Sequence, residues 1–118
     1  MSNSIREKFF KKAGEVKRKE VELDDIGTVV VESPDIQDMI YLVGKLEGDI
    51  KQDNPKAMER MAKLVINRTF TEDGKPLFNK GDLEYLKKDR SGNVLLLYAE
   101  IVSLLNMTAE ELEKAKKN

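Results

Sequence analysis

The fold is decided by the stretch EVELDDIGTVVVE, residues 20–32. Two strand-like runs, Glu20–Leu23 and Thr28–Glu32, flank the four residues Asp24–Gly27. Aliphatic and β-branched side chains favour strands, and a loop of Asp and Gly permits the positive φ angles of a tight turn. The stretch therefore predicts a β-hairpin. An isolated hairpin is marginally stable in water, so we expect this one to pack against helices.

Helix signals follow the hairpin. Ser33-Pro34 and Asn54-Pro55 each place a capping side chain before a proline, which favours the first turn of a helix. Apolar residues then recur at spacings of three and four, as on one helix face. We expect the first two of these helices to form an antiparallel pair. The predicted helices cover about residues 34–50, 55–68, 81–88, 92–105 and 109–116.

The segment 92–105 is the most apolar in the chain and is predicted to be the central core helix. Its expected buried face holds Leu95, Tyr98, Ile101, Val102 and Leu105.

The N-terminal segment carries its own helix signal. Ser4 and Glu7 have the spacing of a capping box, and a basic helix within residues 1–15 is expected to end near Gly14. The chain of 118 residues and 13.5 kDa fits one domain. We predict a single α+β domain over residues 1–118, predominantly helical, with the hairpin at 20–32 and a helical core at 33–118.

The composition removes most catalytic chemistry. The chain has no Cys and no His, which excludes thiolate nucleophiles, Cys-His pairs and imidazole-bound metals. Asp24 and Asp25 carry carboxylates that can bind a cation, but they lack the ligand spacing of a calcium loop and are typical turn residues. We expect no enzyme activity, and no catalytic, cofactor-binding or metal-binding residue.

The charge is high but balanced, with 21 basic and 22 acidic side chains. It is uneven along the chain: residues 1–20 carry an excess of four positive charges, and residues 21–60 an excess of six negative charges. A duplex-binding domain normally has an overall basic excess, so no nucleic-acid partner is expected. No apolar run approaches 18 residues, so no membrane partner is expected either. A charged protein partner fits this pattern better.

A few apolar residues are candidates for partner contacts. Phe9 and Phe10 are adjacent on a basic helix, and adjacent positions cannot both face one core. Met58 and Met61 have adaptable thioether side chains, which suit either a binding surface or core filling, with core filling favoured. The candidate partner-binding set is Phe9, Phe10, Met58, Met61 and Tyr85.

Several segments occur in an order typical of one family. They are GTVVVE at 27–32, a helix started by Ser and Pro, LVINR at 64–68, DGKPLF at 73–78, DLEYL at 82–86 and LNMTAEELEKAKKN at 105–118. Over about residues 20–118 the chain resembles the tail assembly chaperones of long-tailed, siphovirus-type bacteriophages and prophages. The basic N-terminal helix is not part of this resemblance.

The resemblance implies a non-catalytic role in the host bacterial cytoplasm. Such chaperones bind the phage tape-measure protein, keep it soluble, help recruit tail-tube protein subunits, and are absent from the mature virion. It also implies self-association or a longer product of ribosomal frameshifting. Lys116-Lys117-Asn118 can be encoded by a slippery A-rich run, or be a simple solubilising tail. The alternatives are a small structural adaptor of the phage head–tail or tail completion machinery and a DNA-binding regulatory domain, which the near-neutral charge disfavours.

Overall fold

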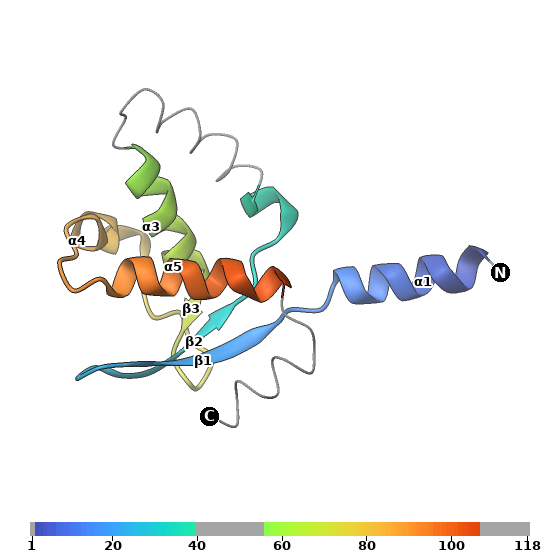
Figure 1. Ribbon diagram of the computed structural model, residues 1–118, viewed down its shortest axis with the longest axis horizontal. Coiled ribbons are helices and arrows are strands. Elements are labelled where there is room, and N and C mark those ends of the chain that lie inside the picture. The colour runs from blue at the N-terminus through green and yellow to red at the C-terminus, as the bar shows by residue number, and fades with distance from the viewer. Residues whose placement is uncertain (1, 40–55, 107–118) are drawn as a thin grey trace.

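The computed structural model describes residues 2–39 and 56–106 (Figure 1). A three-stranded antiparallel sheet, formed by β1 (Arg18–Leu23), β2 (Gly27–Glu32) and β3 (Thr69–Phe70) in that order, lies against α5 (Asn93–Ser103). Helix α3 (Lys56–Arg68) packs against both α5 and α4 (Leu83–Lys87). The predicted fold class, a mostly helical α+β domain with a small antiparallel sheet, is confirmed. The elements are α1 (Ser2–Ala13), β1 (Arg18–Leu23), β2 (Gly27–Glu32), α3 (Lys56–Arg68), β3 (Thr69–Phe70), a 3₁₀ turn (Lys80–Asp82), α4 (Leu83–Lys87), α5 (Asn93–Ser103) and a second 3₁₀ turn (Leu104–Asn106).

The predicted hairpin is present and slightly longer than expected. Val21 pairs with Val29, and Leu23 pairs with Gly27, so the loop has three residues, 24–26, rather than the four predicted. Asp25 adopts the left-handed region at φ 64°, and Gly27 has φ 132°. These angles suit the short polar side chain of Asp and the missing side chain of Gly, which explains why this loop sequence closes the hairpin.

The two faces of the hairpin differ in chemistry because successive strand residues point to opposite sides. The covered face carries four buried aliphatic residues: Val21, Leu23, Val29 and Val31. The other face carries Glu20 and Glu22, which are exposed. Lys19 shares the covered face, and its ammonium group lies 2.6 Å from the carboxylate of Glu100 on α5. The sheet therefore meets α5 through an aliphatic layer with one ion pair at its border.

The third strand was not predicted. Thr69 and Phe70 directly follow α3 and pair with Val31 and Val30 of β2. Phe70 also forms an isolated bridge with Pro76, beyond the turn. Two residues are too few to show the alternation by which a strand is recognised in a sequence. The pairing nevertheless fixes the C-terminal end of α3 to the sheet.

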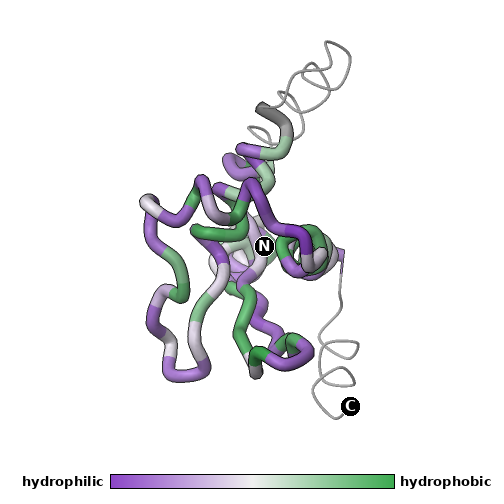
Figure 2. Tube along the Cα trace, turned by 90° about the vertical axis from the view of Figure 1, so that its left-hand side faces the viewer, coloured by the Kyte–Doolittle hydropathy of each residue, from purple (hydrophilic) through white to green (hydrophobic). Residues whose placement is uncertain are grey.

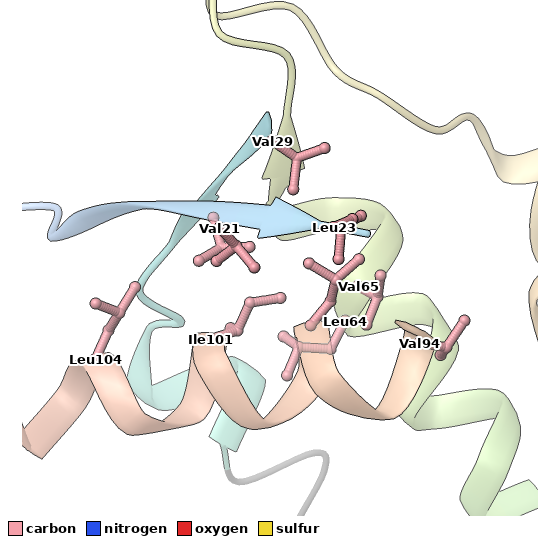
Figure 3. Packing of buried hydrophobic residues seen from close by; sticks show 10 residues of the cluster. Val21, Leu23, Val29, Leu64, Val65, Val94, Ile101 and Leu104 are labelled. Atoms are coloured by element: carbon pink, nitrogen blue, oxygen red, sulfur yellow. The ribbon is translucent and has the colours of Figure 1, made fainter. Parts of the chain in front are cut away.

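The core lies between the hairpin, α5 and α3, as Figure 3 shows. Ile101 of α5 faces Val21, Leu104 of the following 3₁₀ turn lies farther along the same side, and Leu64 and Val65 of α3 lie near Leu23. The buried residues of α5 and the following turn have spacings of three, four and three, and they are Val94, Leu97, Ile101 and Leu104. The segment 92–105 is thus the central helix, as predicted.

The predicted buried face of this helix is partly wrong. Ile101 is buried, but Leu95 is 50% exposed and Leu105 is 41% exposed. The segment has apolar residues on all sides, so its periodicity does not define which side meets the sheet. Val94 and Leu97 are buried against the core, where the prediction had placed Leu95. Tyr98 and Val102 are half-buried and pack at the border of the core.

The start of α5 depends on a side chain that the sequence analysis did not identify. The Asp89 carboxylate accepts backbone N–H hydrogen bonds from Ser91, Gly92 and Val94, each at 3.1 Å. It also accepts the Ser91 hydroxyl at 2.6 Å. The Ser91 hydroxyl, followed by these N–H groups, holds the pKa of the Asp89 carboxyl below its ordinary value of 3.8. Asp89 therefore holds the turn that precedes α5 and satisfies one free N–H group of the helix itself, that of Val94, while the Ser91 hydroxyl accepts the Asn93 N–H at 3.1 Å.

Two other predicted helix starts are displaced. The turn at residues 36–39 is capped by Asp35, whose carboxylate accepts the Asp38 N–H at 2.8 Å. Ser33, the predicted cap, instead extends the hairpin by accepting the Lys17 N–H at 3.0 Å. Likewise α1 begins at Ser2, so Ser4 lies inside the helix rather than at its cap.

Several predictions cannot be compared with the structure. Four of them fall outside the described residues: the rest of the helix predicted at 34–50, its antiparallel packing with the next helix, the helix predicted at 109–116, and the C-terminal run Lys116-Lys117-Asn118.

The helix predicted at 81–88 can be compared, and it is a 3₁₀ turn followed by α4.

The position of the core makes a direct prediction about stability. Ile101→Ala should lower the free energy of unfolding by about 3 kcal/mol, because it leaves a cavity between α5 and the sheet. Leu95→Ala removes a similar side chain from the exposed side of the same helix and should cost less than about 1 kcal/mol. Urea unfolding followed by circular dichroism measures both values. Equal losses in the two variants would contradict the observed face of α5.

The cap of α5 predicts a pH-dependent effect. Asp89→Ala should lower the free energy of unfolding by about 1 kcal/mol at neutral pH, because the N–H groups lose their acceptor. Since the folded-state pKa is depressed, the charge-dependent stabilisation is present above pH 3.8 and is lost as the pH falls through the lower folded-state pKa.

The matched control is Asp89→Asn, which keeps an acceptor oxygen but cannot ionise. It should unfold with less pH dependence than the wild type over the acid range, measured by urea unfolding at a series of pH values. If Asp89→Ala had the same free energy of unfolding as the wild type at neutral pH, the cap would not be needed for stability.

Candidate protein-binding surface

Helix α1 projects away from the rest of the described chain (Figure 1). Phe9 and Phe10 are 68% and 55% exposed, and Ile5 is exposed as well. The two rings meet edge to face at 5.9 Å, and the Arg6 guanidinium lies 4.6 Å from the centre of the Phe10 ring. These aromatic side chains therefore contact each other and a neighbouring cation, and they lie outside the core cluster.

The remaining sequence candidates lie elsewhere. Met58, near the start of α3, is exposed, and Tyr85 on α4 is 79% exposed. Met61 is half-buried and packs against the core cluster, so less of its thioether is available to a partner. α1 and α4 lie at opposite ends of the molecule in Figure 1. The structure thus brings Phe9 and Phe10 together but does not join them to Tyr85 in one patch.

A further apolar surface was missed by the sequence analysis. Leu95, Leu96 and Ala99 are exposed on the side of α5 that faces away from the sheet. We call these three residues the outer face of α5. The signal was present in the sequence, because a helix that is apolar on all sides is normally covered on all sides. The sequence analysis placed Leu95 in the core and identified neither Leu96 nor Ala99 as a surface candidate.

The distribution of polar residues supports the distinction between surface and core. In Figure 2 hydrophilic and hydrophobic stretches alternate along the trace, with hydrophilic residues prominent at the turns. The outer face of α5 and the apolar side of α1 are two places where neighbouring apolar side chains are exposed together. Exposed apolar groups that are close together mark interaction sites more often than isolated ones do.

One cavity of about 380 Å³ opens between α3 and the segment that leads into α4. Its walls are Lys63, Ile66, Asn67, Lys80 and Leu83. Lys63 also pairs with Glu59 at 3.5 Å. The walls supply amines, an amide and aliphatic carbon.

Other polar groups have structural roles. Asp24 and Asp25 lie at the exposed tip of the hairpin, and the part of the chain that the structure describes contains no group of three acidic side chains placed to hold a metal ion. Burial raises the pKa of the Tyr98 hydroxyl, which lies at the border of the core. Within residues 2–39 and 56–106, no helix is both long and apolar enough to cross a membrane.

The fold is similar to a solved structure, that of the bacteriophage HK97 tail assembly chaperone. The TM-score is 0.61 at 15% sequence identity, and the similarity covers 85% of this chain and 99% of the HK97 chain. No protein-family model and no curated protein matches the sequence. The fold expected from the family resemblance is therefore the fold observed.

The exposure of α1 predicts that its aromatic residues contribute little to folding. The double substitution Phe9→Ser and Phe10→Ser should change the free energy of unfolding of the sheet and the helices packed on it by less than about 0.5 kcal/mol. Thermal unfolding followed by tyrosine fluorescence measures this, since the chain has no Trp. A loss as large as that of Ile101→Ala would show that these rings pack on the core.

Proposed function

We propose that this chain is a phage tail assembly chaperone that binds the tape-measure protein and keeps it soluble. The proposal rests on one observation above all: the similarity of fold extends over 99% of the HK97 tail assembly chaperone. The ordered sequence segments from the β2 region to the C-terminus support the same assignment independently of the fold.

The surface of the described residues suits such a role. A long helical client with apolar stripes aggregates unless those stripes are covered. This chain combines a highly charged surface with exposed apolar residues on α1, on α4 and on α5. Charge keeps the chaperone itself dispersed, and the apolar residues supply the attraction to the client.

Within this proposal Phe9, Phe10, Met58, Met61 and Tyr85 are candidate client contacts. Phe9, Phe10 and Tyr85 are the strongest of these, because their side chains are the most exposed. Aromatic rings bury a large area for few rotatable bonds, which is why they are enriched at interfaces. Met61 is the weakest, since it already packs against the core.

The assembly role follows from reversible binding. Many copies bound along one client need only a modest affinity each, because their contributions combine. A coat of this kind leaves as tail-tube subunits take its place, so we propose that the chaperone also helps to recruit those subunits. It acts in the host bacterial cytoplasm and is absent from the mature virion.

Co-expression with the tape-measure protein of the same phage tests the proposal. The client should move from the insoluble to the soluble fraction in the presence of this chain, by about tenfold or more if covering its apolar surface controls aggregation. The Phe9→Ser and Phe10→Ser variant should be less effective while remaining folded. The readout is the amount of client in the supernatant after centrifugation.

An unrelated acidic protein of similar size is the control for a general effect of expression. The proposal fails if the client is equally soluble with and without this chain. Immunoblotting of purified particles separates the chaperone from the alternative of a tail or head–tail adaptor, because an adaptor stays in the finished particle and a chaperone does not.

A further inference from the structure

The outer face of α5 is built differently from the rest of the surface. Successive helical residues are separated by 100°, so Leu95, Leu96 and Ala99 point away from the side that carries Leu97 and Ile101. The buried side chains meet the sheet, and the three outer ones are exposed. Ala99 lies in the middle of the outer arc, where its small side chain permits another backbone to approach closely.

The outer face offers a partner no hydrogen bonds. The carboxylate of Glu100 is turned to the sheet and paired with Lys19 at 2.6 Å. The Ser103 hydroxyl donates to the Glu100 carbonyl at 2.9 Å. A partner segment must therefore satisfy its own backbone polar groups, which a helix does and an extended strand does not. The chemistry of the face thus selects a helix with an apolar stripe.

The charge at the N-terminal end of α5 narrows the partner further. Lys88 and Arg90 are exposed in the turn that leads into the helix, and neither forms an ion pair with a described residue. Lys87, just before them, is paired with Glu84 at 3.4 Å. Asp89 lies between the two cations, but its oxygens accept backbone hydrogen bonds. This end of the surface therefore favours acidic groups on the partner.

We propose that the outer face of α5 binds an amphipathic client helix whose apolar stripe is flanked by acidic residues. Leu95 and Leu96 pack against the stripe on either side of Ala99, while Lys88 and Arg90 attract the acidic flank. The inference rests on the proposed function for the identity of the client, but the chemistry of the binding surface is independent of it.

A synthetic helical peptide tests the surface directly. The probe is a capped, fluorescently labelled peptide of about 20 residues with Leu at heptad spacing and Glu flanking the stripe. A second peptide has Lys in place of each Glu. Fluorescence anisotropy with the full chain should show tighter binding of the Glu peptide, and raising the salt concentration should reduce this preference.

The variant Leu95→Gln with Leu96→Gln should weaken binding of the Glu peptide by about tenfold or more, because both apolar contacts are lost. Ile26→Gln is the matched control, since Ile26 is an exposed aliphatic residue at the hairpin tip, away from α5. Circular dichroism and thermal unfolding establish that both variants are folded. Lys88→Glu with Arg90→Glu should reverse the preference between the two peptides without removing the apolar contribution.

The outcomes separate this inference from the proposed function. If the double Gln variant binds the Glu peptide as tightly as the wild type, the outer face is not the binding surface, whatever the client experiment shows. If the double Gln variant binds the peptide normally and differs from the wild type only in its oligomeric state, measured by analytical ultracentrifugation, the face joins copies of this protein, and the inference is overturned. If the wild type binds the peptide but leaves the tape-measure protein insoluble, the surface stands and the proposed function fails.

Discussion

The structure depends on the contact between α5 and the hairpin. Ile101, Leu97 and Leu104 are almost fully buried, and the hairpin presents Val21, Val29 and Val31 to them. A two-stranded hairpin has too little covered surface to be stable alone, and a short helix is marginal in water. Each supplies the apolar surface that the other lacks. The short strand β3 and helix α3 complete the core around this contact.

Much of the fold could be predicted because its signals are local. The hairpin follows from Asp25 and Gly27 between two aliphatic runs, and α3 follows from Asn54-Pro55 and a regular apolar spacing. Where the prediction was wrong, the deciding interaction was not local. Ser33 has the sequence context of a helix cap, but its hydroxyl accepts a hydrogen bond from the backbone N–H of Lys17, on the other side of the hairpin. The buried face of α5 was predicted only in part, because a helix with apolar residues on every side gives no preferred face.

The candidate binding residues show the same division. Phe9 and Phe10 were identified because two adjacent aromatic residues on a helix cannot share one core, and the structure leaves both exposed. Leu95 was predicted to face the core, since sequence periodicity counts apolar residues without knowing what covers them, and Leu96 was not identified as a candidate. Exposure depends on which elements pack where, and that is a property of the tertiary fold. Met61 illustrates the reverse case, because its thioether completes the core.

The position of Lys19 has a consequence for how the protein avoids its own aggregation. Strand β1 is at the margin of the sheet, where unpaired backbone groups can recruit a strand from another molecule. Four of its six residues are charged, and Lys19 points inward, where it is held by Glu100. An added strand would bring its side chains against these charges. A protein proposed to protect an aggregation-prone client thus carries, in its first strand, a barrier to edge-to-edge growth of its own sheet.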